Sequence, residues 1–183
     1  MKVSREQMLE HRERILAAAA RLFRERGFEG VSVAEIMKAA DLTHGGFYGH
    51  FESKEDLMSQ AMAHQIKQAK GLGPNGSAAD FADAYLGTRH RDNPGSGCPI
   101  AALGSEAARA APGVRDVLTQ SIKGTIGKLS DVSLGATPAE RRRAAIASWS
   151  AMVGAVVLAR LVDDPALSKE ILGATRASID LAG

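Results

Sequence analysis

The apolar residues at the start of the chain recur at helical spacing. From Ser4 onwards they follow one face, with arginines and glutamates on the other: Met8, Ile15, Leu16, Ala19, Leu22 and Phe23. Ser4 and Gln7 have the spacing of a capping box, in which each side chain bonds the other's backbone amide. Gly27 stands where a helix commonly ends in a left-handed residue. We therefore expect a first helix between Ser4 and Gly27.

Three further helix starts follow in one local pattern. Their capping residues are Ser32, Thr43 and Ser53, with Glu35 and Asp56 completing two capping boxes. Apolar pairs flank the first two caps, Val31 with Ile36 and Leu42 with Phe47. The middle helix has room for only about two turns, and Asp41 before it is a residue type that tolerates left-handed turns. The pattern predicts a short helix, a turn and a second short helix, followed by a longer one.

Prolines and glycines divide the remainder of the chain. The stretch GLGPNGSAAD predicts a loop and a domain boundary near residue 71, followed by a helix from Asp80 to Arg89. Proline is favoured in the first turn of a helix. It therefore marks four more starts, at Pro99, Pro112, Pro138 and Pro165, of which the second is expected to run to about Asp131 and the third through Arg160. We predict an all-α protein with one domain over residues 1–52, a connecting helix over 53–70 and a second domain over 71–183.

Composition adds limits to this picture. A chain of 183 residues with 4% aromatics and a net charge of +2 is large enough to bury a core, and its mild basicity is compatible with nucleic acid. The single cysteine, Cys98, excludes an internal disulfide. The apolar stretch WSAMVGAVVLA is too short to span a bilayer, and no signal peptide is recognisable at the start. We expect a cytoplasmic protein with no membrane segment.

A long helix followed by two short ones is typical of a three-helix, helix-turn-helix DNA-binding domain. Its core is expected to contain Leu16, Phe23, Ile36, Leu42, Phe47, Phe51 and Leu57. The segment GFEGVSVAEIMKAADLTHGGFYGHFESKEDLM, residues 27–58, resembles the signature of the TetR family of transcriptional repressors. The matching features are Gly27, the Ser32 cap, Ala39 and Ala40 before the turn, and the pattern Tyr48, His50, Phe51, Lys54 and Leu57.

This resemblance implies roles for particular residues. Those implied to contact DNA phosphates are Ser32, Thr43, Tyr48, His50 and Lys54. Base edges would face His44, Gly45 and Gly46. The sequence departs from the family pattern at Asp41, where glycine is usual, at Gly49, and at His44, where lysine or arginine is frequent. Because neutral histidine attracts phosphate less than lysine, the arm KVSREQ and Arg12, Arg24 and Lys38 are expected to add to DNA affinity.

The second domain resembles the ligand-binding and dimerisation domain of the same family. The segment SAMVGAVVLARLVDDPALSKEIL is similar to the last two helices, which pack against their twins in a homodimer. The segment GCPIAALGSEAARAAPGVRDVL is similar to the start of a pocket helix. Apolarity and position single out candidate residues for a small-molecule effector pocket: Phe81, Tyr85, Cys98, Leu103, Ile122, Trp149, Met152 and Val153.

These expectations describe a repressor that a small molecule releases from a palindromic double-stranded operator, without catalysis, cofactor or metal. One alternative is a redox or electrophile sensor in which Cys98, at a helix start that favours the thiolate, is modified. A helical enzyme is a different class, but the sequence has no paired carboxylates in a consistent frame and no phosphate-binding glycine loop. A DNA-architectural protein without an effector remains a third alternative.

Overall fold

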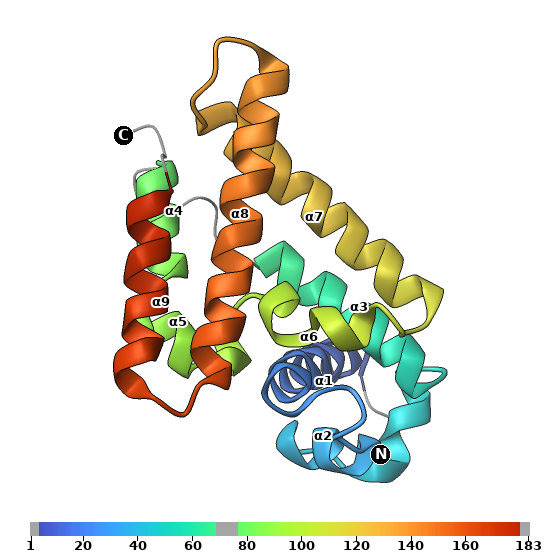
Figure 1. Ribbon diagram of the computed structural model, residues 1–183. Coiled ribbons are helices and arrows are strands. Elements are labelled where there is room, and N and C mark those ends of the chain that lie inside the picture. Colours follow the sequence, from blue (N-terminus) through green and yellow to red (C-terminus); the bar gives the residue numbers. More distant parts are fainter. Residues whose placement is uncertain (1–3, 69–76, 180–183) are drawn as a thin grey trace. The chain divides into compact units, whose positions relative to one another are not determined.

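The computed structural model describes residues 4–68 and 77–179, and these residues form helices without a β-strand (Figure 1). The helices of the first part are α1 (Arg5–Arg26), α2 (Val33–Ala39), the 3₁₀-helix η1 (His44–Gly49) and α3 (Lys54–Gln68). The second part contains α4 (Ala78–Tyr85), α5 (Thr88–Asp92), η2 (Pro94–Ser96), α6 (Pro99–Ala107), α7 (Pro112–Val132), α8 (Pro138–Leu161) and α9 (Pro165–Ser178). The all-α prediction is confirmed.

Local capping patterns determine where most helices begin. The predicted capping boxes of Ser4 with Gln7 and Ser32 with Glu35 are both formed. Ser53 accepts the amide of Asp56 at 3.1 Å, but the Asp56 carboxylate accepts the amide of Glu52 instead of that of Ser53. The four predicted proline starts are confirmed at α6, α7, α8 and α9.

One predicted helix is wrong in extent. Instead of a continuous helix from Asp80 to Arg89, the chain forms α4 and α5, with an interruption at Leu86 and Gly87. Gly87 has extended backbone geometry, φ −73° and ψ 151°, and serves as the N-cap of α5. Glycine stabilises a helix interior less than any other residue except proline, so the break falls there.

The chain packs into two compact units. The N-terminal unit comprises residues 1–69 and 102–119, and the C-terminal unit comprises residues 70–101 and 120–183. The sequence-based division assigned every residue from 71 onwards to the second domain. In the structure, residues 102–119, which are the end of α6 and the start of α7, pack with the first helices.

The core of the N-terminal unit joins α1 to α2 and α3. Of the seven apolar residues predicted to hold it together, all are buried except Leu42, which is half-buried. Gly27 ends α1 with φ 79° and ψ 168°. Its φ is positive as expected, but its ψ places it outside the left-handed helical region, in a conformation that is essentially restricted to glycine. The Glu106 carboxylate accepts the next amide, that of Phe28, at 2.7 Å.

The core of the C-terminal unit is built around α8, which packs along α9 and also contacts α4 and α5 (Figure 1). Its centre contains Tyr85, Leu129, Trp149, Met152 and Val156. By length and composition alone α8 would suit a membrane span, and 33% of its most apolar stretch is buried. Much of the apolar surface of α8 is therefore not buried within the single chain.

Candidate functional site

The segment between α2 and α3 adopts a tighter helix than the sequence predicted. It is a 3₁₀-helix, η1, whose hydrogen bonds join Gly46 N–H to the Thr43 carbonyl at 3.1 Å and His50 N–H to the Phe47 carbonyl at 2.9 Å. Three glycines among its last five residues disfavour an α-helix, and 3₁₀ geometry is common in such short connecting segments. Asp41, where the family has glycine, takes φ 62° and makes the turn left-handed.

The residues predicted to face base edges lie together on the surface of this segment. His44, Gly45 and Gly46 are all exposed. A Cβ at Gly45 would meet no atom within 4 Å, and one at Gly46 would meet only the Met37 methyl at 3.7 Å and the Thr43 hydroxyl at 4.0 Å. Beneath them Phe47 is buried and stacks on Phe51, with ring centroids 5.7 Å apart. The segment is thus anchored from within and bare on its outer face.

The residues predicted to contact phosphates differ in exposure. Tyr48 is 75% exposed and Thr43 is exposed too, while His50 and Lys54 are half-buried. Thr43 is the N-cap of η1 by its backbone, but its side chain makes no capping hydrogen bond. Its hydroxyl is thus not committed to the helix.

Ser32 is exposed, but its hydroxyl is already committed. It donates to the Glu35 carboxylate at 2.8 Å and accepts the Glu35 amide at 3.2 Å. The Arg26 guanidinium also binds this carboxylate. Its hydrogen bond is the largest, and those from Ser32 are the next, of the causes that lower the pKa of Glu35 to about 2. A phosphate contact by the Ser32 hydroxyl would have to displace its bond to a carboxylate that stays ionised.

Arg12 has a structural position that the sequence did not predict. Its guanidinium donates to the His50 carbonyl and to the Gln60 side chain, and it lies 4.6 Å from the centre of the Phe51 ring. Arg24, also expected to add to DNA affinity, is buried. Lys38, the third residue expected to add to DNA affinity, is exposed. The arm KVSREQ begins among residues outside the described part.

His50 is half-buried next to the Arg12 guanidinium, which donates to its carbonyl. Burial, followed by the neighbouring His11 and Arg12, lowers the pKa of His50 below its ordinary value of 6.5. The His11 and His50 rings meet edge to face at 6.2 Å. At neutral pH His50 is therefore uncharged and offers a phosphate a hydrogen bond without a positive charge.

Seven of the eight predicted pocket residues gather in the core of the C-terminal unit. Tyr85, Trp149 and Met152 are buried in it, and the other four pack against it half-buried: Phe81, Cys98, Ile122 and Val153. Leu103 is buried, but it belongs to the N-terminal unit. Sequence position alone did not separate Leu103 from the others, because the boundary between the units falls inside α6.

A set of hydrogen bonds holds the loop before α6. His90 Nε2 accepts the backbone amide of Cys98 at 3.0 Å, and His90 Nδ1 lies 2.6 Å from the Tyr85 carbonyl. Since Nε2 accepts, His90 is the neutral tautomer with its proton on Nδ1, which donates to Tyr85. Burial, the largest cause, lowers the pKa of His90 below its ordinary value.

Arg160, which the sequence did not single out, ties this loop to α8. Its guanidinium donates to the carbonyls of His90 at 2.7 Å and Arg91 at 3.0 Å, with a longer contact of 3.5 Å to Ala101. Burial lowers its pKa. The only available signal was an arginine at the end of a long apolar stretch, which does not reveal its distant partners.

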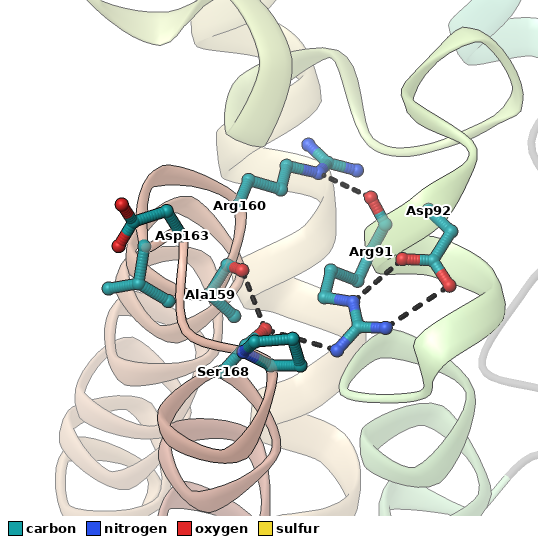
Figure 2. A pocket seen from close by; sticks show the side chains of 8 residues that line it. Arg91, Asp92, Ala159, Arg160, Asp163 and Ser168 are labelled. Atoms are coloured by element: carbon teal, nitrogen blue, oxygen red, sulfur yellow. Dashed lines mark hydrogen bonds and ion pairs between the residues drawn. The ribbon is translucent and has the colours of Figure 1, made fainter.

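A surface cavity of about 310 Å³ lies beside this network, between α5 and the α8–α9 turn (Figure 2). Arg91 forms a two-pronged ion pair with Asp92 and donates to Ser168, whose hydroxyl donates to the Ala159 carbonyl. None of the predicted pocket residues lines it. Its polar groups are bonded to one another, so it joins helices and offers few uncommitted groups to a ligand. Within the described ranges, no three His, Cys, Asp or Glu side chains are placed to hold a metal ion.

Comparison with known proteins places this geometry in a family. The model for "Bacterial regulatory proteins, tetR family" matches residues 15–61. The transcriptional regulator AcrR of Shigella flexneri is 42% identical over 57 residues, which are 31% of this chain and 26% of that protein. The chain spans about a quarter of the length of the first curated relatives it matches. The transcriptional repressor NemR of Escherichia coli K12 is 29% identical over 129 residues, 65% of each chain.

Solved structures extend the likeness to both units. The reduced form of E. coli NemR matches 94% of this chain and 97% of its own with a TM-score of 0.70 at 23% identity. A TetR transcriptional regulator from Chloroflexus aurantiacus covers 95% of this chain and 96% of its own with a TM-score of 0.73 at 25% identity. Residues 15–61 thus carry the helix-turn-helix segment of the TetR family of transcriptional regulators, and the helices of both units match the fold of solved TetR regulators.

Proposed function

We propose that this protein is a DNA-binding transcriptional repressor, which a small molecule releases from a palindromic operator. The observation that carries the proposal is the outer face of η1, where Tyr48, Thr43 and His44 are exposed together with Gly45 and Gly46. Glycines at such a face let the backbone approach base edges closely, and this segment occupies the position of the recognition helix.

The DNA contacts follow from the chemistry of each residue. Thr43, Tyr48 and His50 donate hydrogen bonds to phosphates, Lys54 adds charge, and these contacts fix position without selecting sequence. His44 is the one side chain of the glycine-rich turn long enough to reach a base edge, so methyl contacts and DNA shape supply the remaining specificity. Ser32 contributes only where a phosphate displaces Glu35.

Operator binding provides the test, with the palindrome flanking the gene as probe. Lys54→Ala is expected to weaken binding and to reduce the slope of log affinity against log salt by about 1. Tyr48→Phe is expected to weaken binding without changing that slope, because no charge is lost. Lys123→Ala on α7, an exposed lysine in the C-terminal unit, serves as the matched control. Unchanged affinity in both variants would refute the assigned contacts.

The dimer interface is proposed on α8 and α9. Five of the eight exposed large hydrophobic side chains in the described part lie there: Ile146, Val157, Leu158, Leu161 and Leu167. On α8 they follow helical spacing with Ser150 and Gly154 between them, and a Cβ at Gly154 would meet no atom within 4 Å. An apolar helical face with small residues suits close packing against its twin about a two-fold axis. The same axis accounts for a palindromic operator.

Leu158→Glu tests the interface. Leu158 is 52% exposed, so the substitution costs the single chain little, while in a dimer it buries a carboxylate against apolar side chains. Light scattering is expected to show a monomer, with a large loss of operator affinity. Leu134→Glu, at a 48% exposed leucine outside α8 and α9, is the control and should remain dimeric. A dimeric Leu158→Glu protein would place the interface elsewhere.

The effector is proposed to bind in the C-terminal unit, among the predicted residues that meet in its core. It shifts the protein away from the operator only as far as it binds the DNA-incompatible state more tightly. Leu103, which belongs to the other unit, is not among the residues proposed to line this site. The effector is expected to weaken operator binding by some factor, and the operator should then weaken effector binding by that same factor.

A second candidate function is sensing of oxidants or electrophiles by Cys98. The thiol is half-buried, lies close to the Tyr85 hydroxyl and immediately precedes α6. NemR, which has a comparable fold, has been solved in a reduced form. If Cys98 is the sensor, Cys98→Ala will stay on the operator when treated with N-ethylmaleimide or peroxide. Normal release by Cys98→Ala would eliminate this candidate and leave the main proposal standing.

A further inference from the structure

Two polar atoms buried in the apolar core of the C-terminal unit have no hydrogen-bond partner. They are the Tyr85 hydroxyl oxygen and the Trp149 indole nitrogen. The two residues are only 7% and 6% exposed. Buried polar groups in proteins are nearly always paired, because an unpaired one loses its hydration without compensation. Two such groups in one core therefore call for a specific explanation.

These two groups come together from different helices. Tyr85 ends α4 and Trp149 lies at the middle of α8, and both belong to one apolar cluster. The Cys98 thiol and the Trp149 indole are close enough to act on the pKa of Tyr85, although neither makes a well-directed hydrogen bond to its hydroxyl. Burial first, and Cys98 second, raise this pKa far above its ordinary value. The hydroxyl therefore keeps its proton, and the pair presents two donors.

The Tyr85 side chain is held in place by contacts that do not involve its hydroxyl. Its ring lies edge to face against His90, with centroids 4.5 Å apart, and 5.5 Å from the centre of Phe81. The Tyr85 carbonyl is held by His90 Nδ1 at 2.6 Å. The ring is thus fixed by packing, and its hydroxyl makes no well-directed hydrogen bond within the protein.

The surroundings specify what kind of molecule fits. The margin of the cluster consists of half-buried apolar side chains and the thiol: Phe81, Cys98, Ile122, Ile126 and Val153. The nearby Arg160 guanidinium already donates to backbone carbonyls, so these donors are not free to bind a carboxylate. Asp80 also has a buried oxygen without a partner, but it lies roughly 140° around α4 from Tyr85. Apolar neighbours and two buried donors match an apolar molecule with an acceptor oxygen.

We propose that Tyr85 and Trp149 form the recognition pair for an uncharged, largely apolar small molecule whose carbonyl-type oxygen accepts both hydrogen bonds. This rests on the proposed function in placing the effector in the C-terminal unit, and it adds the chemical class. The indole N–H donates and cannot accept, so an acceptor is required of the ligand. The two donors remain unpaired in the free protein, and that raises the affinity for a ligand that pairs them.

Calorimetric titration of the full chain with indan-1-one, and with indane as the isostere without an acceptor, tests the pair. The wild type is expected to bind indan-1-one more tightly than indane. Tyr85→Phe and Trp149→Phe should each weaken indan-1-one binding by about threefold to tenfold and leave indane binding nearly unchanged. Lys123→Ala, at an exposed lysine of α7, is the control and should bind both compounds as the wild type does.

Thermal unfolding without ligand gives a second test, in which Tyr85→Phe should not be impaired although its binding of indan-1-one is weaker. Removing an unpaired hydroxyl removes its desolvation cost, so Tyr85→Phe should leave Tm unchanged or raise it by about 2 to 4 °C. Equal binding of indan-1-one and indane by the wild type, equal indan-1-one affinity in wild type and Tyr85→Phe, or a clear fall in Tm for Tyr85→Phe would each overturn the proposal. Because no DNA is present, failure here is distinguishable from failure to bind an operator.

Discussion

The end of α1 allows a sharp test of how the N-terminal unit is held together. Gly27 combines φ 79° with ψ 168°, and a Cβ placed there would lie 2.6 Å from Glu106 Oε1 and 2.9 Å from Oε2. That carboxylate accepts the Phe28 amide at 2.7 Å. Gly27→Ala therefore imposes two separate costs, a backbone conformation that alanine rarely adopts and the displacement of Glu106.

The two costs can be estimated separately. The strained backbone costs about 1 to 3 kcal/mol for a residue other than glycine. Loss of a hydrogen bond between a buried amide and a charged carboxylate costs about 1.5 to 3 kcal/mol. Gly27→Ala should thus lower the free energy of unfolding by about 3 to 5 kcal/mol, and Glu106→Ala by about 1.5 to 3 kcal/mol. In the double variant the displaced carboxylate is already absent, so the total should not exceed that of Gly27→Ala by much.

Urea unfolding followed by far-UV circular dichroism at one fixed protein concentration measures all three variants. Gly45→Ala is the matched control, because the same substitution there meets open space and no positive φ. Its free energy of unfolding should be unchanged or up to about 1 kcal/mol higher. Strictly additive losses for Gly27→Ala and Glu106→Ala would refute the contact between the two positions as the cause.

Three further expectations concern both units. Gly45→Ala, although it folds normally, should weaken operator binding in a fluorescence anisotropy titration, and undiminished affinity would contradict close backbone approach. Arg160→Ala should lower the free energy of unfolding by about 2 to 4 kcal/mol, measured by denaturant unfolding with Trp149 fluorescence as the signal. Arg160→Lys should lose less, because it keeps one donor group. The pKa of His90 lies below its ordinary value of 6.5 in the folded protein, so its contribution to stability is full above pH 6.5 and is lost as the pH falls through the folded pKa. Unfolding measured at a series of pH values should show this loss, and His90→Gln should reduce it; an identical profile in both proteins would exclude His90 as its source.

Local signals in the sequence determined most helix boundaries. Capping boxes at Ser4 and Ser32 and proline in the first turns of α6 to α9 depend on atoms only a few residues apart, so the sequence contains all that is needed to find them. The same is true of the helix-turn-helix pattern, because its apolar spacing is set within about forty residues. The exception is η1, where the competition between α- and 3₁₀-geometry is decided by small energy differences at three glycines.

The tertiary structure decided which side chains remain available. Arg12 has the composition of a phosphate contact, but its partners are the His50 carbonyl and Gln60, far along the chain. Arg160 and Glu106 likewise act on backbone groups 50 or more residues away. Sequence spacing is silent about such pairings, because they depend on which surfaces meet when helices pack. For the same reason the sequence could name Tyr85 and Trp149 as pocket candidates, but only their packing revealed two buried donors without an acceptor.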